Sequence, residues 1–353
     1  MTSIRSSEAV GIAGIPRLTL GMRPTPLQAV PELAEAMGVP VDLWVKRDDL
    51  FGPGVGGNKV RKLEYVIADA LRAGCDTLIT AGAVQSNHAR LTAVAGATCG
   101  LDVHLVLSGE PAEASGGNLL LDKLAGASLH FVTASGFDEL LREMETLADS
   151  LHEAGATPRV IPVGASVQLG AVGYADTYLE LLEQLEERDV DADWVLHASG
   201  SGGTQGGLLA GRALAGRGPR VVGGIVEPMG DGTLRRRVAE LYRDTLLLLR
   251  AGDATRARAS EDQLVASPDV LFGGEESPYG SVTAAGVAAM TAALRSCGLL
   301  LDPVYTAKAL AALPSLLAAG VVESGQTVVF LHTGGTPAMF SSGLVGAIEE
   351  ALC

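Results

Sequence analysis

The chain has 353 residues, more than one hydrophobic core usually supports, so we expect two domains that share a cleft. Its formal net charge of −15 comes from 26 basic and 41 acidic residues. This charge argues against nucleic acid or an anionic membrane surface as a partner, because both attract clustered lysine and arginine. An anionic ligand would therefore be held by local N–H groups and dipoles.

Cysteine usage and the chain's apolar stretches indicate the compartment. The four cysteines show neither a CxxC pair nor the spacing of zinc ligands, as is typical of a reduced intracellular protein. They are Cys75, Cys99, Cys297 and Cys353. Residues 1–16 lack a basic segment followed by a continuous apolar core, and Pro314 and Gly320 interrupt the apolar stretch 309–322. We therefore expect a soluble cytoplasmic protein.

Short apolar runs alternate with longer runs of helical periodicity from Thr77 onward. This rhythm predicts parallel strands joined by helical crossovers. The first strands are predicted at 77–81, 103–107, 129–132 and 160–163.

A second series of buried strands follows further along the chain. Its strands are predicted at 194–197, 221–226 and 327–332, and its helices at 203–215, 233–250, 281–296 and 335–351. The two series together predict an α/β fold with two open, mostly parallel sheets and helices on both faces.

The domain boundaries follow from the grouping of these elements. Residues 64–164 hold four strand-and-helix units of their own, whereas the flanking parts supply a glycine-rich turn and the C-terminal strand. We therefore predict a small α/β domain at 64–164, inserted into a discontinuous larger domain of residues 1–63 and 165–353. Residues 251–278 are charged, weakly periodic and rich in Gly, Ser and Pro, and we interpret them as a long loop near the cleft.

Lys59 is one of five lysines in the chain and follows the glycine pair in Gly56-Gly57-Asn58-Lys59. Lysine is the side chain that forms Schiff bases, and a glycine-rich approach lets a flat cofactor come close to the backbone. The alternative is a solvated lysine at the start of a helix, which describes most lysines in such a position.

A second motif, Ser199-Gly200-Ser201-Gly202-Gly203-Thr204, offers consecutive backbone N–H groups and hydroxyls ahead of an apolar helical stretch. A phosphate dianion requires such groups, although an ordinary strand-to-helix turn has them too. Gln205 stands where a dinucleotide fingerprint has glycine, and no Gly-Lys-Ser/Thr follows, so a single phosphate monoester fits better than ATP or NAD. Together with Lys59, this motif suggests pyridoxal phosphate held at two points.

The run Gln85-Ser86-Asn87-His88 follows a predicted strand and opens a helix. Its N–H groups would lie at the carboxyl end of a parallel sheet, a natural seat for a substrate carboxylate. An ordinary helix N-cap is an equally good interpretation of Ser86 and Asn87. His88 would either transfer a proton or orient the loop, and since the six histidines show no HExxH-like pairing, we expect no metal site.

As a set, these motifs resemble the D-cysteine desulfhydrase and 1-aminocyclopropane-1-carboxylate deaminase family, a branch of the tryptophan synthase β-like, fold type II pyridoxal-phosphate enzymes. The resemblance runs from about Pro16 to Glu350. Besides the motifs above, it depends on LWVKRDDL at 43–50, LDPVYT at 301–306 and HTGG at 332–335. It implies pyridoxal 5'-phosphate as cofactor, a small amino acid as substrate and a homodimer.

The resemblance also implies roles for individual residues. Lys59 would bond covalently to the cofactor and then move the substrate's α-proton. Asn87 would hydrogen-bond the cofactor's ring oxygen, while Ser86 and the N–H groups through His88 would hold the substrate carboxylate. Tyr279 and Tyr305 would line the substrate face, one of them with a part in proton transfer, and Thr306 and Thr333 would lie near the pyridine nitrogen. The residues that would bind the phosphate are Gly200, Ser201, Gly202, Gly203 and Thr204.

Two positions separate activities within the family. In the deaminases a glutamate typically follows the second tyrosine and keeps the pyridine nitrogen protonated, whereas this chain has Thr306. His88 stands where the deaminase-like pattern tends to have glutamine. Both differences favour the desulfhydrase-like branch, in which D-cysteine or a close β-substituted alanine yields pyruvate, ammonia and sulfide. The alternatives are an L-cysteate sulfo-lyase or specialised amino-acid lyase, a cyclopropane deaminase, a non-catalytic cofactor-binding protein and, more weakly, a nucleotide-binding oxidoreductase.

Overall fold

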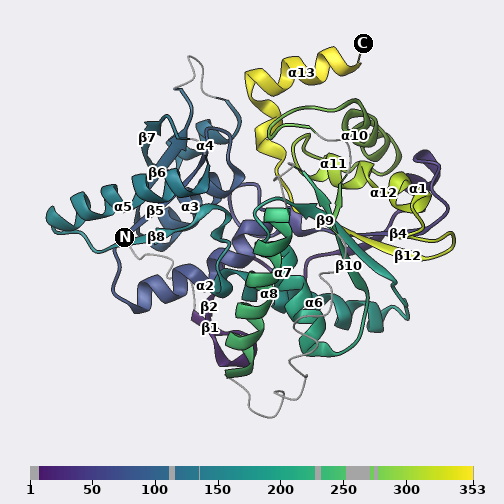
Figure 1. The fold of residues 1–353 in the computed structure, drawn as a ribbon, viewed down its shortest axis with the longest axis horizontal. Helices are drawn as coiled ribbons and strands as arrows, with labels where there is room; N and C mark the ends of the chain where they lie inside the picture. The colour runs from purple at the N-terminus through teal and green to yellow at the C-terminus, as the bar shows by residue number, and fades with distance from the viewer. Residues whose placement is uncertain are drawn as a thin grey trace.

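The computed structural model describes residues 8–110, 116–134, 136–226, 232–251, 271–273 and 277–352 (Figure 1). Two separate sheets with helices around them form the body, and the α/β fold predicted from the sequence is confirmed. A short antiparallel hairpin of β1 (Glu8–Val10) and β2 (Pro16–Leu18), joined by η1 (Ile12–Gly14), precedes them.

The smaller sheet has the strand order β7-β6-β5-β8, and all its pairs are parallel. Its strands are β5 (Thr77–Ala83), β6 (Asp102–Ser108), β7 (Ser128–Val132) and β8 (Pro158–Ile161), and its helices are α3 (Asn87–Cys99), α4 (Gly117–Leu124) and α5 (Phe137–Glu153). Each predicted strand from 77 to 163 is confirmed within about two residues. The helices lie on both faces of the sheet, since Leu105 packs in one core cluster and the adjacent Val106 in another.

The larger sheet has the order β11-β10-β9-β12-β4-β3, with only β3 antiparallel to its neighbour among the described strands. Its strands are β3 (Leu27–Ala29), β4 (Asp42–Lys46), β9 (Trp194–Ser199), β10 (Arg220–Ile225), β11 (Leu271–Gly273) and β12 (Thr327–Leu331). Strand β11 lies inside the segment interpreted as a long loop, so that interpretation is wrong for residues 271–273. The rest of that segment, 252–270 and 274–276, lies outside the described residues.

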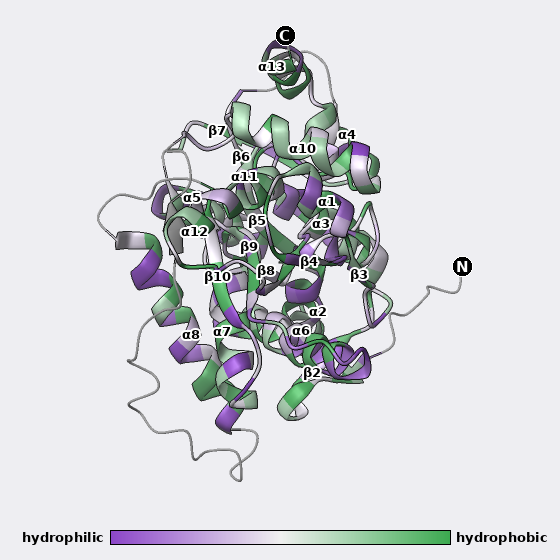
Figure 2. Cartoon of the chain, turned by 90° about the vertical axis from the view of Figure 1, so that its right-hand side faces the viewer, coloured by the Kyte–Doolittle hydropathy of each residue, from purple (hydrophilic) through white to green (hydrophobic). Residues whose placement is uncertain are grey.

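Helices cover both faces of the larger sheet, because neighbouring strand residues are buried in different clusters. Val195 and Val329 pack toward α6 and α7, whereas Leu196 and Phe330 pack toward α10 and α11. The strands are accordingly apolar in the interior, and outer helices such as α8 carry hydrophilic segments (Figure 2). The helices of this part are α1 (Pro31–Ala36), α6 (Gln168–Glu187), α7 (Gly203–Ala215), α8 (Thr233–Ala251), α10 (Ala284–Cys297), α11 (Thr306–Ala311) and α12 (Leu313–Ala318).

The C-terminal segment corrects one prediction. The helix predicted at 335–351 is divided into η5 (Thr336–Phe340) and α13 (Ser342–Leu352), because Ser341 between them has extended backbone angles. Helix α13 projects from the body (Figure 1). None of the helices in the described ranges combines the length and apolarity that crossing a membrane requires.

Helix α2 (Asn58–Arg72) joins the two halves of the molecule, with η2 (Asp48–Leu50) before it and η3 (Val163–Ala165) later in the chain. Its apolar side, including Leu63 and Ile67, packs in the core of the smaller sheet. All four strands of that sheet lie within residues 64–164, but α2 runs across the predicted boundary at residue 63. The division into two domains remains a proposal.

Candidate active site

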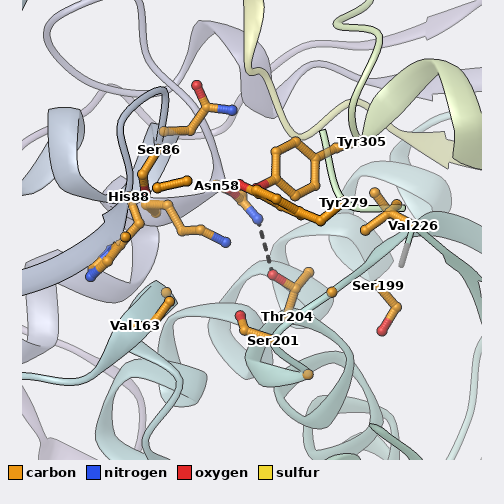
Figure 3. A pocket seen from close by; sticks show the side chains of 18 of the residues that line it. Asn58, Ser86, His88, Val163, Ser199, Ser201, Thr204, Val226, Tyr279 and Tyr305 are labelled. Carbon is orange, nitrogen blue, oxygen red and sulfur yellow. Dashed lines mark hydrogen bonds between the residues drawn. The ribbon is translucent and has the colours of Figure 1, made fainter. Parts of the chain in front are cut away.

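A cavity of about 270 Å³ opens where the carboxyl ends of both sheets meet the N-terminus of α2 (Figure 3). Ligands bind at this edge in open α/β sheets. Among its lining residues are most of the predicted site: Lys59, Ser86, Asn87, His88, Gly200, Ser201, Gly202, Thr204, Tyr279, Tyr305 and Thr333.

Lys59 occupies the first turn of α2. The turn before it needs glycine, because Gly57 has a φ of 130° and a Cβ there would lie 3.1 Å from the carbonyl oxygen of Thr333. The N–H of Asn58 donates to that same oxygen at 3.0 Å, which fixes the start of the helix. Burial lowers the pKa of Lys59 to about 8, and no described residue accepts a hydrogen bond from its Nζ. The amine is therefore partly neutral near pH 7 and available for chemistry.

Lys62 lies one turn further along α2 and was not identified from the sequence. It is fully buried, and its Nζ donates to the carbonyl oxygen of Gly164 at 3.2 Å. Burial, with Lys59 as the next contributor, lowers its pKa well below the usual range. A Cβ on Gly203 would lie 2.7 Å from this Nζ, so the amine reaches the glycine-rich turn. The three-residue spacing from Lys59, which places both on one helix face, was the available signal.

The glycine-rich turn has the geometry that an anion needs. Gly202 is left-handed at φ 82°, and α7 begins at Gly203, so the first N–H groups of that helix, at Gly203 and Thr204, have no intrahelical partner. The side-chain amide of Asn58 donates to the hydroxyl of Thr204 at 3.1 Å (Figure 3), which joins this turn to the lysine helix. Gly203 itself is not among the lining residues, because it packs under Ser166 and Lys62.

The N-terminus of α3 forms the opposite wall. Ser86 is its N-cap and accepts from the N–H of Ala89 at 3.2 Å, so it both caps the helix and lines the cavity. His88 Nε2 lies 2.8 Å from the hydroxyl of Thr80, which donates its only hydrogen to the carbonyl oxygen of Ile161. His88 therefore donates from Nε2, and burial, followed by the charges of Lys59 and Lys62, lowers its pKa well below its ordinary value. A neutral ring held in this way fits orientation of the loop better than proton transfer.

Two tyrosines close the remaining side. Their hydroxyl groups lie 2.6 Å apart, and the rings of Tyr279 and Tyr305 meet edge to face (Figure 3). Thr333 also lines the cavity, but Thr306 does not. The Thr306 hydroxyl hydrogen-bonds the buried carboxylate of Asp302 at 2.7 Å, which also accepts from the N–H groups of the same turn. Thr306 therefore stabilises the start of α11.

These residues fit pyridoxal phosphate. A free amine for the aldehyde and a helix N-terminus for the phosphate meet in one cavity, and the buried amine of Lys62 lies beside that N-terminus, outside the cavity lining. No Asp or Glu is among the described residues that line it. The described residues also contain no group of three or more side chains able to hold a metal ion.

Comparisons with known proteins indicate the same cofactor. Residues 18–334 match the family model described as "Pyridoxal-phosphate dependent enzyme". The chain is 40% identical over 332 residues to "Putative 1-aminocyclopropane-1-carboxylate deaminase" of Pyrococcus abyssi, covering 94% of this chain and 95% of that protein. It is 38% identical over 333 residues to "D-cysteine desulfhydrase" of Salmonella typhi, covering 92% and 96%.

Solved structures show the same fold. A structure described as "Crystal Structure Analysis of the ACC deaminase homologue" has a TM-score of 0.82 and 34% identity, covering 96% of this chain and 97% of that one. A threonine deaminase from Solanum lycopersicum has a TM-score of 0.63 at 18% identity, covering 94% and 84%, and shows the shared fold alone.

Proposed function

Because the chain belongs to the family of pyridoxal-phosphate dependent enzymes, we propose that it is a lyase that eliminates sulfide from D-cysteine or a close β-substituted alanine. The cofactor and the enzyme class follow from the family, and the substrate is the proposal. The net reaction converts D-cysteine and water to pyruvate, ammonia and hydrogen sulfide. The observation that carries it is the low-pKa amine of Lys59, which has no hydrogen-bond acceptor among the described residues and lies in one cavity with the glycine-rich turn.

Different walls of the cavity would bind different parts of the cofactor and the substrate. Bound pyridoxal phosphate supplies an electron sink for the negative charge left at the α-carbon. The phosphate would be held by the turn from Gly200 to Thr204 and the N–H groups at the start of α7, with the positive charge of Lys62 behind Gly203. The N-terminus of α3, from Ser86 to His88, would hold the substrate carboxylate.

Two kinds of proton transfer remain for this chain's own side chains. Lys59 Nζ takes the proton from the α-carbon, which its pKa of about 8 allows near neutral pH. The hydroxyl pair of Tyr279 and Tyr305 lines the same cavity and would donate a proton to the departing sulfur. Replacing Lys59 by alanine should lower turnover by at least about 10² to 10⁴, the usual contribution of a general base.

The lining of the cavity bears on the choice of substrate. A deaminase that opens a cyclopropane ring benefits from a carboxylate that keeps the pyridine nitrogen protonated, and none lines the described part of this cavity. His88 is held neutral and supplies no such charge. These two observations favour β-elimination over ring opening.

A panel of amino acids tests the proposal. The 2-oxo acid released from D-cysteine, L-cysteine, L-cysteate, D-serine and 1-aminocyclopropane-1-carboxylate is measured with wild type and Lys59→Ala. We expect the highest kcat/KM with D-cysteine and none with the variant. Release from the cyclopropane substrate alone would contradict the proposal.

Cyclopropane deamination is the second candidate, because a relative at 40% identity carries that name. We further propose the two domains given above, 64–164 and its flanking parts, and a homodimer. Sedimentation of the purified holoenzyme tests the dimer directly.

A further inference from the structure

Asn87, in the cavity wall, is held by a residue from a different helix. The side-chain amide of Asn118, in α4, donates from Nδ2 to Oδ1 of Asn87 at 2.8 Å and to the carbonyl oxygen of Gln85 at 2.7 Å. Asn118 is fully buried, and the N-terminus of α4 is fixed by Gln85, which accepts from the Asn118 N–H at 2.8 Å. Both the backbone N–H and the side chain of Asn118 are thus hydrogen-bonded to residues at the N-terminus of α3.

The orientation of both amides is determined by a third residue. The Nε of Arg90 donates to Oδ1 of Asn118 at 3.1 Å. A guanidinium has donors only and no acceptor, so the atom of Asn118 that faces it must be the oxygen. Nδ2 of Asn118 then faces Asn87, and the atom of Asn87 that receives it must again be the oxygen. Nδ2 of Asn87 is consequently left as a donor.

Arg90 is itself held rigidly. It is fully buried, and its Nη1 donates to the carbonyl oxygens of Gly54 and Gly56, in the turn that precedes Lys59. At the other end, no described residue accepts a hydrogen bond from Nδ2 of Asn87. A Cβ on Gly335 would lie 2.9 Å from that atom, so the absence of a side chain at this glycine leaves the donor uncovered.

We propose that Asn118 is a positioning residue, which through Arg90 and its own amide fixes Asn87 with Nδ2 directed as a donor to the ring oxygen of bound pyridoxal phosphate. The inference relies on the cofactor but not on the choice between D-cysteine and a cyclopropane substrate. A donor at the ring oxygen stabilises the anionic form of that oxygen. It therefore lowers the pKa of the proton that the oxygen shares with the Lys59 nitrogen when Lys59 is bonded to the cofactor.

The substitution Asn118→Asp reverses this orientation while preserving shape. An aspartate still accepts from Arg90 but has no hydrogen to give to Asn87 or to the carbonyl oxygen of Gln85. Asn87 therefore turns its own Nδ2 toward position 118 and its oxygen toward the cofactor. Asn118→Ala removes the constraint without adding charge. Leu119→Ala is the matched control, because it loosens the same helix at a buried apolar position outside this set of hydrogen bonds.

The test is a pH titration of the visible absorption spectrum of the holoenzyme, with no substrate present. The quantity compared is the pH at the midpoint of the spectral change. Loss of a hydrogen bond to an anion predicts that N118D raises the midpoint by about one pH unit, with a smaller rise in N118A. L119A should lower the melting temperature and leave the midpoint unchanged.

An unchanged midpoint in both Asn118 variants would overturn the proposal, and so would a shift in N118D alone, which reports only the added charge. If N118D does not fold, N118A decides: a rise supports the proposal and its absence refutes it. A failure of the substrate panel would leave this result unaffected.

Discussion

Helix α2 carries basic side chains on two faces, fully buried at Arg61 and Lys62 and partly buried at Lys59, and the surroundings of the two faces differ. On one face, Arg61 has no exposed side-chain surface and hydrogen-bonds Asp48 at 2.8 Å and Glu180 at 2.7 Å. Burial lowers the pKa of Arg61, but its two acidic partners outweigh burial and raise that pKa above its usual value. Burial raises the pKa of Glu180, but Arg61 outweighs burial and lowers that pKa to about 2. Lys46 joins the same cluster through Glu180.

On the other face, Lys59 and Lys62 have no acidic partner within the described residues, and burial lowers the pKa of both. A buried cation without a counter-charge costs stability, so a chain keeps one where a ligand will supply the negative charge or the chemistry. We infer from this contrast that the paired face of α2 stabilises the fold, and we propose that the unpaired face binds the cofactor.

The largest effect we expect concerns the paired face. Arg61→Met leaves Asp48 buried without its ion-pair partner, and such a loss typically costs about 3 to 5 kcal/mol. Urea unfolding of the apoenzyme measures it. Lys59→Met, on the other face, should leave the free energy of unfolding equal or higher. Equal losses in the two variants would remove the distinction between the faces.

A second, smaller effect concerns the affinity for the cofactor. Lys62→Met removes the amine that we propose interacts with the phosphate. A charge-assisted interaction of this kind is worth about 1.5 to 3 kcal/mol, so the Kd for pyridoxal phosphate should rise roughly tenfold to a hundredfold. Spectroscopic titration of the apoenzyme measures this change, with the exposed Lys123→Met as control. Unchanged affinity in Lys62→Met would show that Lys62 is structural.

The smallest effect is a pH dependence of the apoenzyme. Lys59 has a pKa of about 8 in the folded protein and an ordinary value of 10.5. Between these values the unfolded chain binds a proton that the folded chain lacks, so the free energy of unfolding rises with pH across this window. The rise should be smaller in Lys59→Met than in wild type when both are unfolded in urea at about pH 7.5, 8.5 and 9.5. Parallel plots of the free energy of unfolding against pH for the two proteins would mean that folding does not lower the pKa of Lys59.

The sequence predicted the parts of the fold whose pattern is local. Strands such as β5 and β9 are continuous apolar runs, and Lys59 and the turn at 200–204 are marked by glycines that close backbone contacts require. Strands β3 and β11, each only three residues long, are too short for a periodic pattern and were missed.

What the sequence did not predict depends on contacts between distant segments. The Thr306 hydroxyl could have faced the cavity, but the buried carboxylate of Asp302 accepts it instead. Asn118 carries no local signal, because its importance comes from Arg90 and Asn87, some thirty positions away. Such roles become visible only when side chains are placed.

The most direct test of the difference between the two faces of α2 is to identify chemically the lysine that bonds to the cofactor. The holoenzyme is reduced with borohydride, digested, and its peptides are analysed by mass spectrometry to find the lysine that carries the cofactor. We predict the pyridoxyl group on Lys59 alone, with Lys62 unmodified. A label on Lys62, or on neither lysine, would contradict the assignment of the cavity.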